Sequence, residues 1–367
     1  MAHLPRLRPL LIALLATVFV RAATPPAPLS TPTPRQAETA AVMRRVFDWQ
    51  AAHPWSAQNP IDSRHGNRGW VQGAFLTGVM EAYRATGDTA YVDYARRTAD
   101  ANGWQLGPRP QHADDHIVGQ TYLELHALEP APEKIAATLA GLDRLLAEAP
   151  SGRELWWWCD ALYMAPPTLA KLANTTGDAR YRDAMDRWFW DSYLAFYDPA
   201  EDLFYRDQRF VFPATGPKTF WSRGNGWVLA GLARLLEELP ADYPTRPRYI
   251  ALFQAMAAKL VAVQPPDGLW RSNLQYPEGQ HGEASGSAFF CYALAWGVNR
   301  GLLPAETYRP AVDRTWSALL ACVDADGRLG WVQPIGFAPG AYDATTSQEY
   351  GAGAFLAAGS QVMKLAP

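Results

Sequence analysis

The sequence predicts an all-α fold, an (α/α)6 barrel in which six helical hairpins close into a ring. Six polar segments, spaced roughly 45 to 65 residues apart, each lead into an apolar helix-forming stretch. Two of the turns between helices are nearly identical, and strand-forming runs are sparse. An open solenoid is the alternative, but polar segments rich in Trp, Asp, Arg, Asn and Glu favour a closed ring in which they line one shared cavity. The six segments begin at 66–70, 114–116, 158–160, 223–227, 282–286 and 346–350.

The turns that join the helices have a clear local signature. Residues 85–91 read ATGDTAY and residues 175–181 read TTGDARY. In both, glycine stands where a helix end needs a positive φ, and aspartate follows where the next helix needs an N-cap. The runs 203–205 and 328–331 are the candidates for short strands in long loops.

The N-terminal residues predict export. Arg6 and Arg8 precede the apolar run 9–20, and the small residues Ala22 and Ala23 follow it. A positive start, a short apolar core and a small-residue exit are typical of a signal peptide, and twelve apolar residues are too few for a stable membrane anchor. We therefore expect a periplasmic or secreted protein, with no membrane anchor after cleavage.

The predicted organisation has three parts. Residues 1–23 are the signal peptide, 24–36 a disordered Pro/Thr-rich lead-in, and 37–367 a single (α/α)6 domain. A net charge of −3 gives no basic stripe for nucleic acid. The three cysteines match neither a disulfide framework nor a metal site, although one disulfide stays open.

Residues 156–160, WWWCD, combine large aromatic rings with a carboxylate. Burial among rings disfavours the charged form, so the pKa of Asp160 should rise and fit the group for proton donation. The alternative is a core helix with a capped or paired aspartate. Trp158 is assigned to the wall of a sugar site, and Trp156 and Trp157 to packing.

The second polar segment carries two carboxylates and two histidines between residues 112 and 116. Asp115 and Gly119 share a helix face, and the glycine allows a close approach. Three interpretations stay open: a substrate-binding or catalytic carboxylate, a helix N-cap, and a metal ligand. The sequence does not decide whether Asp114 or Asp115 faces the cavity.

The fourth polar segment suggests a site for an anionic sugar. Trp221 and Trp227 can stack on a ring, and Arg223 offers a planar fork of donors that suits a carboxylate. Glycines on both sides of Asn225 let the backbone approach a ligand closely. The alternative is a helix N-terminus with packed tryptophans and a paired arginine. The sequence contains no Ser/His/Asp elbow, phosphate loop or dinucleotide fingerprint.

These motifs together resemble the unsaturated rhamnogalacturonyl hydrolases of glycoside hydrolase family 105. The resemblance covers most of residues 38–365 and rests on Asp115 with Gly119 and on four further runs. These are WCDALYMAPP at 158–167, WSRGNGW at 221–227, GWVQP at 330–334 and YGAGAF at 350–355.

The resemblance implies an (α/α)6 enzyme that acts on a pectin lyase product, an oligosaccharide with a 4,5-unsaturated uronic acid at its non-reducing end. Asp160 would protonate the double bond at C4 and activate the water that adds at C5, and Asp115 would assist it. No cofactor or metal is implied. Many members have a histidine where this chain has Arg206, so that position bears on the substrate. The expected substrate-binding residues are Trp158, Arg206, Trp221, Arg223, Asn225, Trp227 and His116.

Two alternatives remain. One is an unsaturated glucuronyl hydrolase that acts on products of other polysaccharide lyases. The other is a catalytically inactive, sugar-binding toroid. A monomer is expected in each case, with an oligosaccharide as the partner.

Overall fold

Twelve long helices alternate between an inner and an outer ring in the part of the chain that the structure describes. The structure is a computed structural model, and it describes residues 32–54, 68–148, 150–211, 217–275 and 281–366. The predicted signal peptide, 1–23, lies outside these ranges, as do Gly66 and Asn67 of the first polar segment.

The inner helices are buried on all sides, whereas the outer helices are amphipathic. All 14 residues of α16 are buried, but only 5 of the 19 residues of α1 are. The inner helices are α3 (Trp70–Thr86), α5 (Val118–Leu128), α9 (Pro166–Thr176), α12 (Ser222–Glu238), α14 (Ala284–Asn299) and α16 (Glu349–Val362). The outer helices are α1 (Pro34–Ala52), α4 (Thr89–Ala101), α6 (Glu133–Glu148), α10 (Ala179–Phe196), α13 (Arg246–Ala262) and α15 (Ala305–Ala321).

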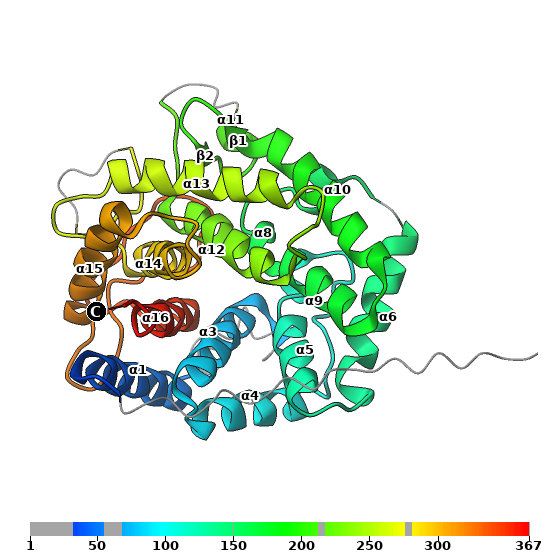
Figure 1. Cartoon of the computed structure of the whole chain (residues 1–367), viewed down its shortest axis with the longest axis horizontal. Helices are drawn as coiled ribbons and strands as arrows, with labels where there is room; N and C mark the ends of the chain where they lie inside the picture. The colour runs from blue at the N-terminus through cyan, green and yellow to red at the C-terminus, as the bar shows by residue number, and fades with distance from the viewer. Residues whose placement is uncertain (1–31, 55–67, 149, 212–216, 276–280, 367) are drawn as a thin grey trace, which may run out of the picture.

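Each inner helix contacts the next around a closed circuit, from α3 through α5, α9, α12 and α14 to α16 and back to α3. Figure 1 looks down this ring, with the outer helices around its edge. The predicted (α/α)6 barrel is therefore confirmed. Short elements lie in the loops: η2 (Ala113–Asp115), α7 (Gly152–Leu155), α8 (Ala161–Met164), α11 (Gln208–Val211), and the antiparallel pair β1 (Tyr197–Asp198) and β2 (Leu203–Phe204).

The outer helix that pairs with α16 is α1, from the opposite end of the domain. It begins at Pro34, so the prediction of disorder for 24–36 is wrong at its end. Thr33 caps this helix, Pro34 takes the first-turn position, and Gln36 bonds back to the backbone of Thr33. This capping box outweighs the Pro/Thr-rich composition.

The two repeated turns have the predicted geometry. Gly87 and Gly177 end their helices with φ near 71° and 75°, and Asp88 and Asp178 cap the helices that follow. The three cysteines are buried free thiols, so the disulfide that the sequence left open does not form.

Backbone contacts between glycines close the ring where its first and last inner helices cross. A Cβ atom on Gly78 of α3 would lie 2.0 Å from the carbonyl oxygen of Gly353 on α16. A Cβ on Gly353 would lie 2.5 Å from the carbonyl oxygen of Ala74. Only glycine permits this separation.

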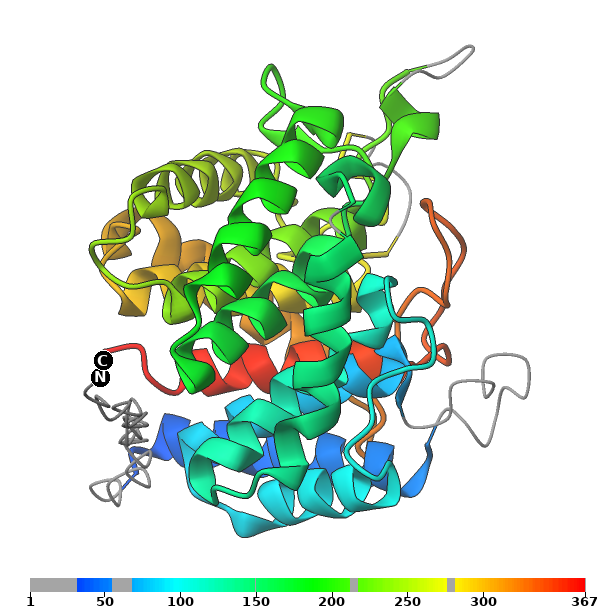
Figure 2. The ribbon, with the colours of Figure 1, turned by 90° about the vertical axis from the view of Figure 1, so that its right-hand side faces the viewer.

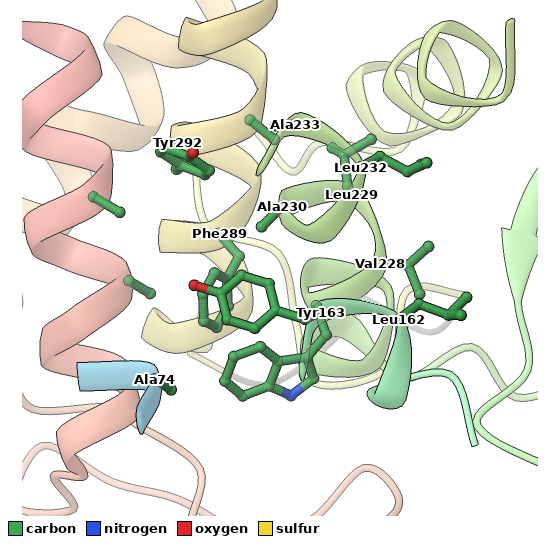
Figure 3. Packing of buried hydrophobic residues seen from close by; sticks show 14 of the residues in the cluster. Ala74, Leu162, Tyr163, Val228, Leu229, Ala230, Leu232, Ala233, Phe289 and Tyr292 are labelled. Atoms are coloured by element: carbon green, nitrogen blue, oxygen red, sulfur yellow. The ribbon is translucent and has the colours of Figure 1, made fainter. Parts of the chain in front are cut away.

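Side chains fill the centre of the ring. Tyr163 extends towards Phe289 in Figure 3, with 5.5 Å between ring centroids, and Trp227 lies 4.3 Å from Phe289. Beyond these rings Arg234 bonds Glu81 and Glu124 at 3.0 and 3.2 Å. The barrel is therefore filled with side chains below its mouth.

That mouth is where the inner helices begin. Each polar segment from the sequence leads into one inner helix, so six helix N-termini meet at one end of the ring. In the side view of Figure 2, α16 runs back from this end towards the C-terminus. Helix N-termini carry partial positive charge and favour anions. No helix in the described part of the chain is long and apolar enough to cross a membrane.

Candidate active site

Asp160 lies at the mouth, immediately before α8, and its residue is only 8% exposed. Its carboxylate makes no capping hydrogen bond to the helix that follows. Burial raises the pKa of Asp160, and the charges of Arg206 and Arg223 oppose this rise. The side chain is thus a desolvated acid rather than a helix cap.

Arg206 is held beside this acid by its backbone and by its neighbour. The carbonyl of Arg206 accepts the backbone N–H of Cys159 at 2.8 Å, and its Nη1 donates to Asp207 at 2.6 Å. Its Nε lies 3.7 Å from Oδ2 of Asp160, is buried, and makes no hydrogen bond. A buried cationic donor without an acceptor beside an acid suits an anionic ligand.

Asp114 is the second carboxyl of the site. Burial and the negative charge of Asp160 together raise the pKa of Asp114 to about 7, although the charge of Arg109 opposes the rise. Nδ1 of His112 lies 3.6 Å from Oδ2 of Asp114. Because the charge of Asp160 acts on Asp114, the two carboxyls titrate as a coupled pair, and their apparent pKa values belong to the pair.

The predicted assistant, Asp115, faces away from the mouth. It has no exposed surface, and the backbone N–H and guanidinium of Arg109 bind both of its oxygens. Successive side chains of the 3₁₀ turn η2 diverge by about 120°, so only one of the two aspartates faces the cavity. We therefore correct the expectation: Asp115 fixes the loop, and Asp114 faces Asp160.

Aromatic rings form one wall of the site. The ring of Trp158 lies 4.6 Å from that of His112 and 4.6 Å from that of Trp157. Trp156 is fully buried, as the packing interpretation predicts, but Trp157 is 44% exposed. Its assignment to packing is wrong, because nearly half of its surface is open to solvent.

Arg223 and Trp221 lie together beneath the mouth. The guanidinium of Arg223 sits 4.4 Å from the Trp221 ring and 4.7 Å from the Tyr350 ring, and donates to the carbonyls of Gln333 and Pro334. Its Nε is buried without a hydrogen-bond partner. Both side chains are almost fully buried, so Arg223 acts on the site through its charge and one remaining donor.

Three predicted binding residues are structural instead. Asn225 is fully buried and exchanges hydrogen bonds with both backbone groups of Phe204, which fixes the segment that carries Arg206. Trp227 is buried in the aromatic centre. His116 is 1% exposed and bonds to the carbonyl of Pro110, and its burial lowers its pKa.

The arrangement is that of an acid site for an anionic ligand. It offers a carboxyl pair with raised pKa values, two arginine donors without acceptors and an aromatic wall. Among the residues described, no group of three or more His, Cys, Asp or Glu side chains is placed to hold a metal ion. The geometry supports proton transfer to a bound anionic sugar.

Sequence reasoning placed His112 in the second polar segment without giving it a role of its own, and it missed the exposure of Trp157. It also missed Gln333, whose side chain accepts hydrogen bonds from the indole of Trp221 and from Ser272. The run GWVQP contained Gln333, but nothing in its spacing indicated those partners.

The whole domain is similar to known proteins. Residues 42–366 match the family described as Glycosyl Hydrolase Family 88. A Formosa agariphila protein named unsaturated 3S-rhamnoglycuronyl hydrolase is 44% identical over 350 residues, covering 89% of this chain and 91% of that protein. An Alteromonas protein of the same name is 34% identical and covers 80% and 77%. A solved family 88 glycosyl hydrolase from Bacteroides vulgatus superposes with a TM-score of 0.82 at 31% identity, covering 89% and 99%.

Proposed function

The chain belongs to glycosyl hydrolase family 88, and on that premise we propose that it removes a 4,5-unsaturated uronic acid from lyase-generated oligosaccharides. The observation that carries the proposal is the pair Asp114 and Asp160 at the mouth, beside Nε of Arg206, which is buried and makes no hydrogen bond. The similarity makes the protein a glycoside hydrolase, and the site supports this particular chemistry.

The proposed reaction begins with a proton from Asp160. The carboxyl gives its proton to C4 of the sugar, and positive charge develops at C5 and the ring oxygen. The Asp160 carboxylate then takes a proton from the water that adds at C5, which restores the acid. The hemiketal that forms collapses and releases the rest of the oligosaccharide.

Arg206 and Arg223 help to keep Asp160 protonated when they bind the carboxylate of the substrate. The carboxylate of an unsaturated uronic acid would meet the Nε group of Arg206 and the positive field of Arg223. When the substrate carboxylate offsets the positive charges of Arg206 and Arg223, these charges lower the pKa of Asp160 less. Binding of the correct anionic sugar therefore favours the protonated acid. Asp114, with a pKa of about 7, binds a hydroxyl or the incoming water.

We propose that the sugar attached to the unsaturated uronate is rhamnose. The two relatives named above are rhamnoglycuronyl hydrolases, and the sequence motifs pointed to rhamnogalacturonan from pectin, which also joins uronate to rhamnose. Arg206 replaces the histidine expected at this position, and it is the residue through which we expect the uronate to be selected.

The test is loss of the ultraviolet absorbance of the conjugated double bond. Unsaturated uronyl–rhamnose disaccharides, with and without sulfate on rhamnose, are compared with unsaturated glucuronan and chondroitin disaccharides. We expect turnover of the rhamnose-linked substrates and its loss in Asp160→Asn. Preference for the other disaccharides would assign the glucuronyl alternative, and binding without turnover would assign the inactive toroid.

We further propose that the protein is exported, loses residues 1–23 and acts as a monomer. The support is the charged start, the apolar run 9–20 and the small residues that follow. Sequencing the N-terminus of the mature protein from the periplasm or medium tests export and cleavage, and size-exclusion chromatography tests the monomer.

A further inference from the structure

A groove of about 540 Å³ opens beside the candidate active site. One side is the proline-rich segment 108–112, and the other is formed by Glu148, Glu154, Leu155 and Trp157. Nothing in the proposed reaction uses this groove, because the acid, its partner and the two arginines all lie at the mouth.

Trp157 is the most unusual feature of the groove. Its side chain is 44% exposed, although the two tryptophans that flank it are buried. The guanidinium of Arg206 lies 5.1 Å from its ring centroid, and the ring of Trp158 lies 4.6 Å away. These contacts hold the indole in place while much of it stays open to solvent, and a fixed, exposed ring is a stacking surface.

The groove is continuous with the carboxyl pair. His112 lines it, and the same histidine contacts the Trp158 ring and lies 3.6 Å from Asp114. Arg206 joins the two regions, since its guanidinium lies over Trp157 and its Nε lies 3.7 Å from Asp160. These distances place the Trp157 ring within about 10 Å of the acid, and this ring is far more exposed than that of Trp158.

The other walls suit a ligand rich in hydroxyl groups. Glu148 accepts a hydrogen bond from Gln111, and Glu154 accepts one from Ser151 at 2.7 Å, so both carboxylates are ordered acceptors. Arg109 lines the groove beside them, with a side chain that is 40% exposed. Carboxylate, amide and guanidinium groups around an indole match the polar edges and apolar faces of a pyranose.

We propose that this groove is a subsite for the leaving saccharide, and that Trp157 stacks on a sugar beyond the first one attached to the unsaturated uronate. The inference rests on the proposed function, because that function sets the direction in which the oligosaccharide lies across the site. It makes the protein selective for longer lyase products over disaccharides.

The experiment compares an unsaturated disaccharide with the tetrasaccharide of the same repeat, in wild type and in Trp157→Ala. The stacking contact predicts a wild-type kcat/KM that is higher for the tetrasaccharide. We expect Trp157→Ala to lower the tetrasaccharide value, through KM, about tenfold more than it lowers the disaccharide value. Trp157→Phe should keep most of the preference, and Leu194→Ala, at a 68% exposed residue that does not line the groove, should keep all of it.

A binding measurement separates this inference from the proposed function. Full-length Asp160→Asn should bind the tetrasaccharide more tightly than the disaccharide by calorimetry, and Asp160→Asn/Trp157→Ala should lose the difference. An equal loss on both substrates would place Trp157 at the first sugar, and no loss on either would leave the groove without a role. Both results overturn the inference. Absence of turnover by the wild type on every substrate would instead overturn the proposed function.

Discussion

Replacement of Arg206 by Gln tests whether a carboxyl pair with raised pKa values supplies the proton. Nε of Arg206 lies 3.7 Å from Oδ2 of Asp160, and the two side chains are 13% and 12% exposed. At this distance two unit charges attract by about 4 kcal/mol at an effective dielectric constant near 20. Water enters the space that Arg206 leaves, and Arg223 still opposes protonation of Asp160. Only part of this energy should therefore appear as a shift in the pKa of the acid.

The direction of the pH shift follows from the role of the acid. A proton donor works in its protonated form, so kcat/KM falls as the pH rises through the pKa of the pair. Arg206 lowers the pKa of both Asp160 and Asp114. Its removal should therefore move the alkaline limb to higher pH by about one to two pH units, while the plateau falls because a substrate contact is lost.

The assay is the pH profile of kcat/KM, followed by loss of ultraviolet absorbance. Arg209→Gln is the matched control, because Arg209 bonds the same Asp207 but is 59% exposed and does not contact the acid. We expect its profile to match the wild type. An alkaline limb that stays in place or moves to lower pH in Arg206→Gln would refute the assignment of the pair as the proton donor.

Three further predictions follow from the same geometry. Asp114→Asn should lower kcat by about 10²-fold or more with an unchanged melting temperature, whereas Asp115→Asn should mainly lower stability; the reverse pattern would restore Asp115 to the site. Arg234→Met should destabilise the fold by about 2 kcal/mol in chemical denaturation, because Glu81 and Glu124 each lose one buried charged hydrogen bond while Arg84 and Lys171 stay paired with them, and a change below about 0.5 kcal/mol would contradict this. Gly78→Ala should cost about 3 kcal/mol or more, since its Cβ would meet a backbone carbonyl on α16, whereas Gly87→Ala, with open space around it, should cost about 1 kcal/mol.

The sequence predicted the ring because its signals are local. Gly87 and Asp88 specify a helix end and a helix start within two residues, and the polar segments mark the start of each inner helix. Asp160 was predicted for a similar reason, since the rings that desolvate it include its own neighbours. The pairing of α1 with α16 was missed because the two helices come from opposite ends of the domain.

The side-chain directions at the mouth could not be predicted from the same pattern. Asp114 and Asp115 are equivalent in the sequence, and only the 3₁₀ turn and the position of Arg109 separate them. Asn225 and Trp227 have the residue types of a sugar site, yet both are buried within the barrel. A cavity wall and a core use the same aromatic residues, so burial decides between them.

The glycine contact between α3 and α16 also determines when the barrel can close during synthesis of the chain. Gly78 and Gly353 are 275 positions apart in the sequence, so the contact that closes the circuit must await synthesis of the inner helices between them. Until then α3 has an uncovered apolar flank, and the partly built ring is open on one side. Such late, long-range closure slows folding and leaves the nascent chain dependent on protection from aggregation. Gly78 and Gly353, which close the ring, therefore also determine when its assembly can finish.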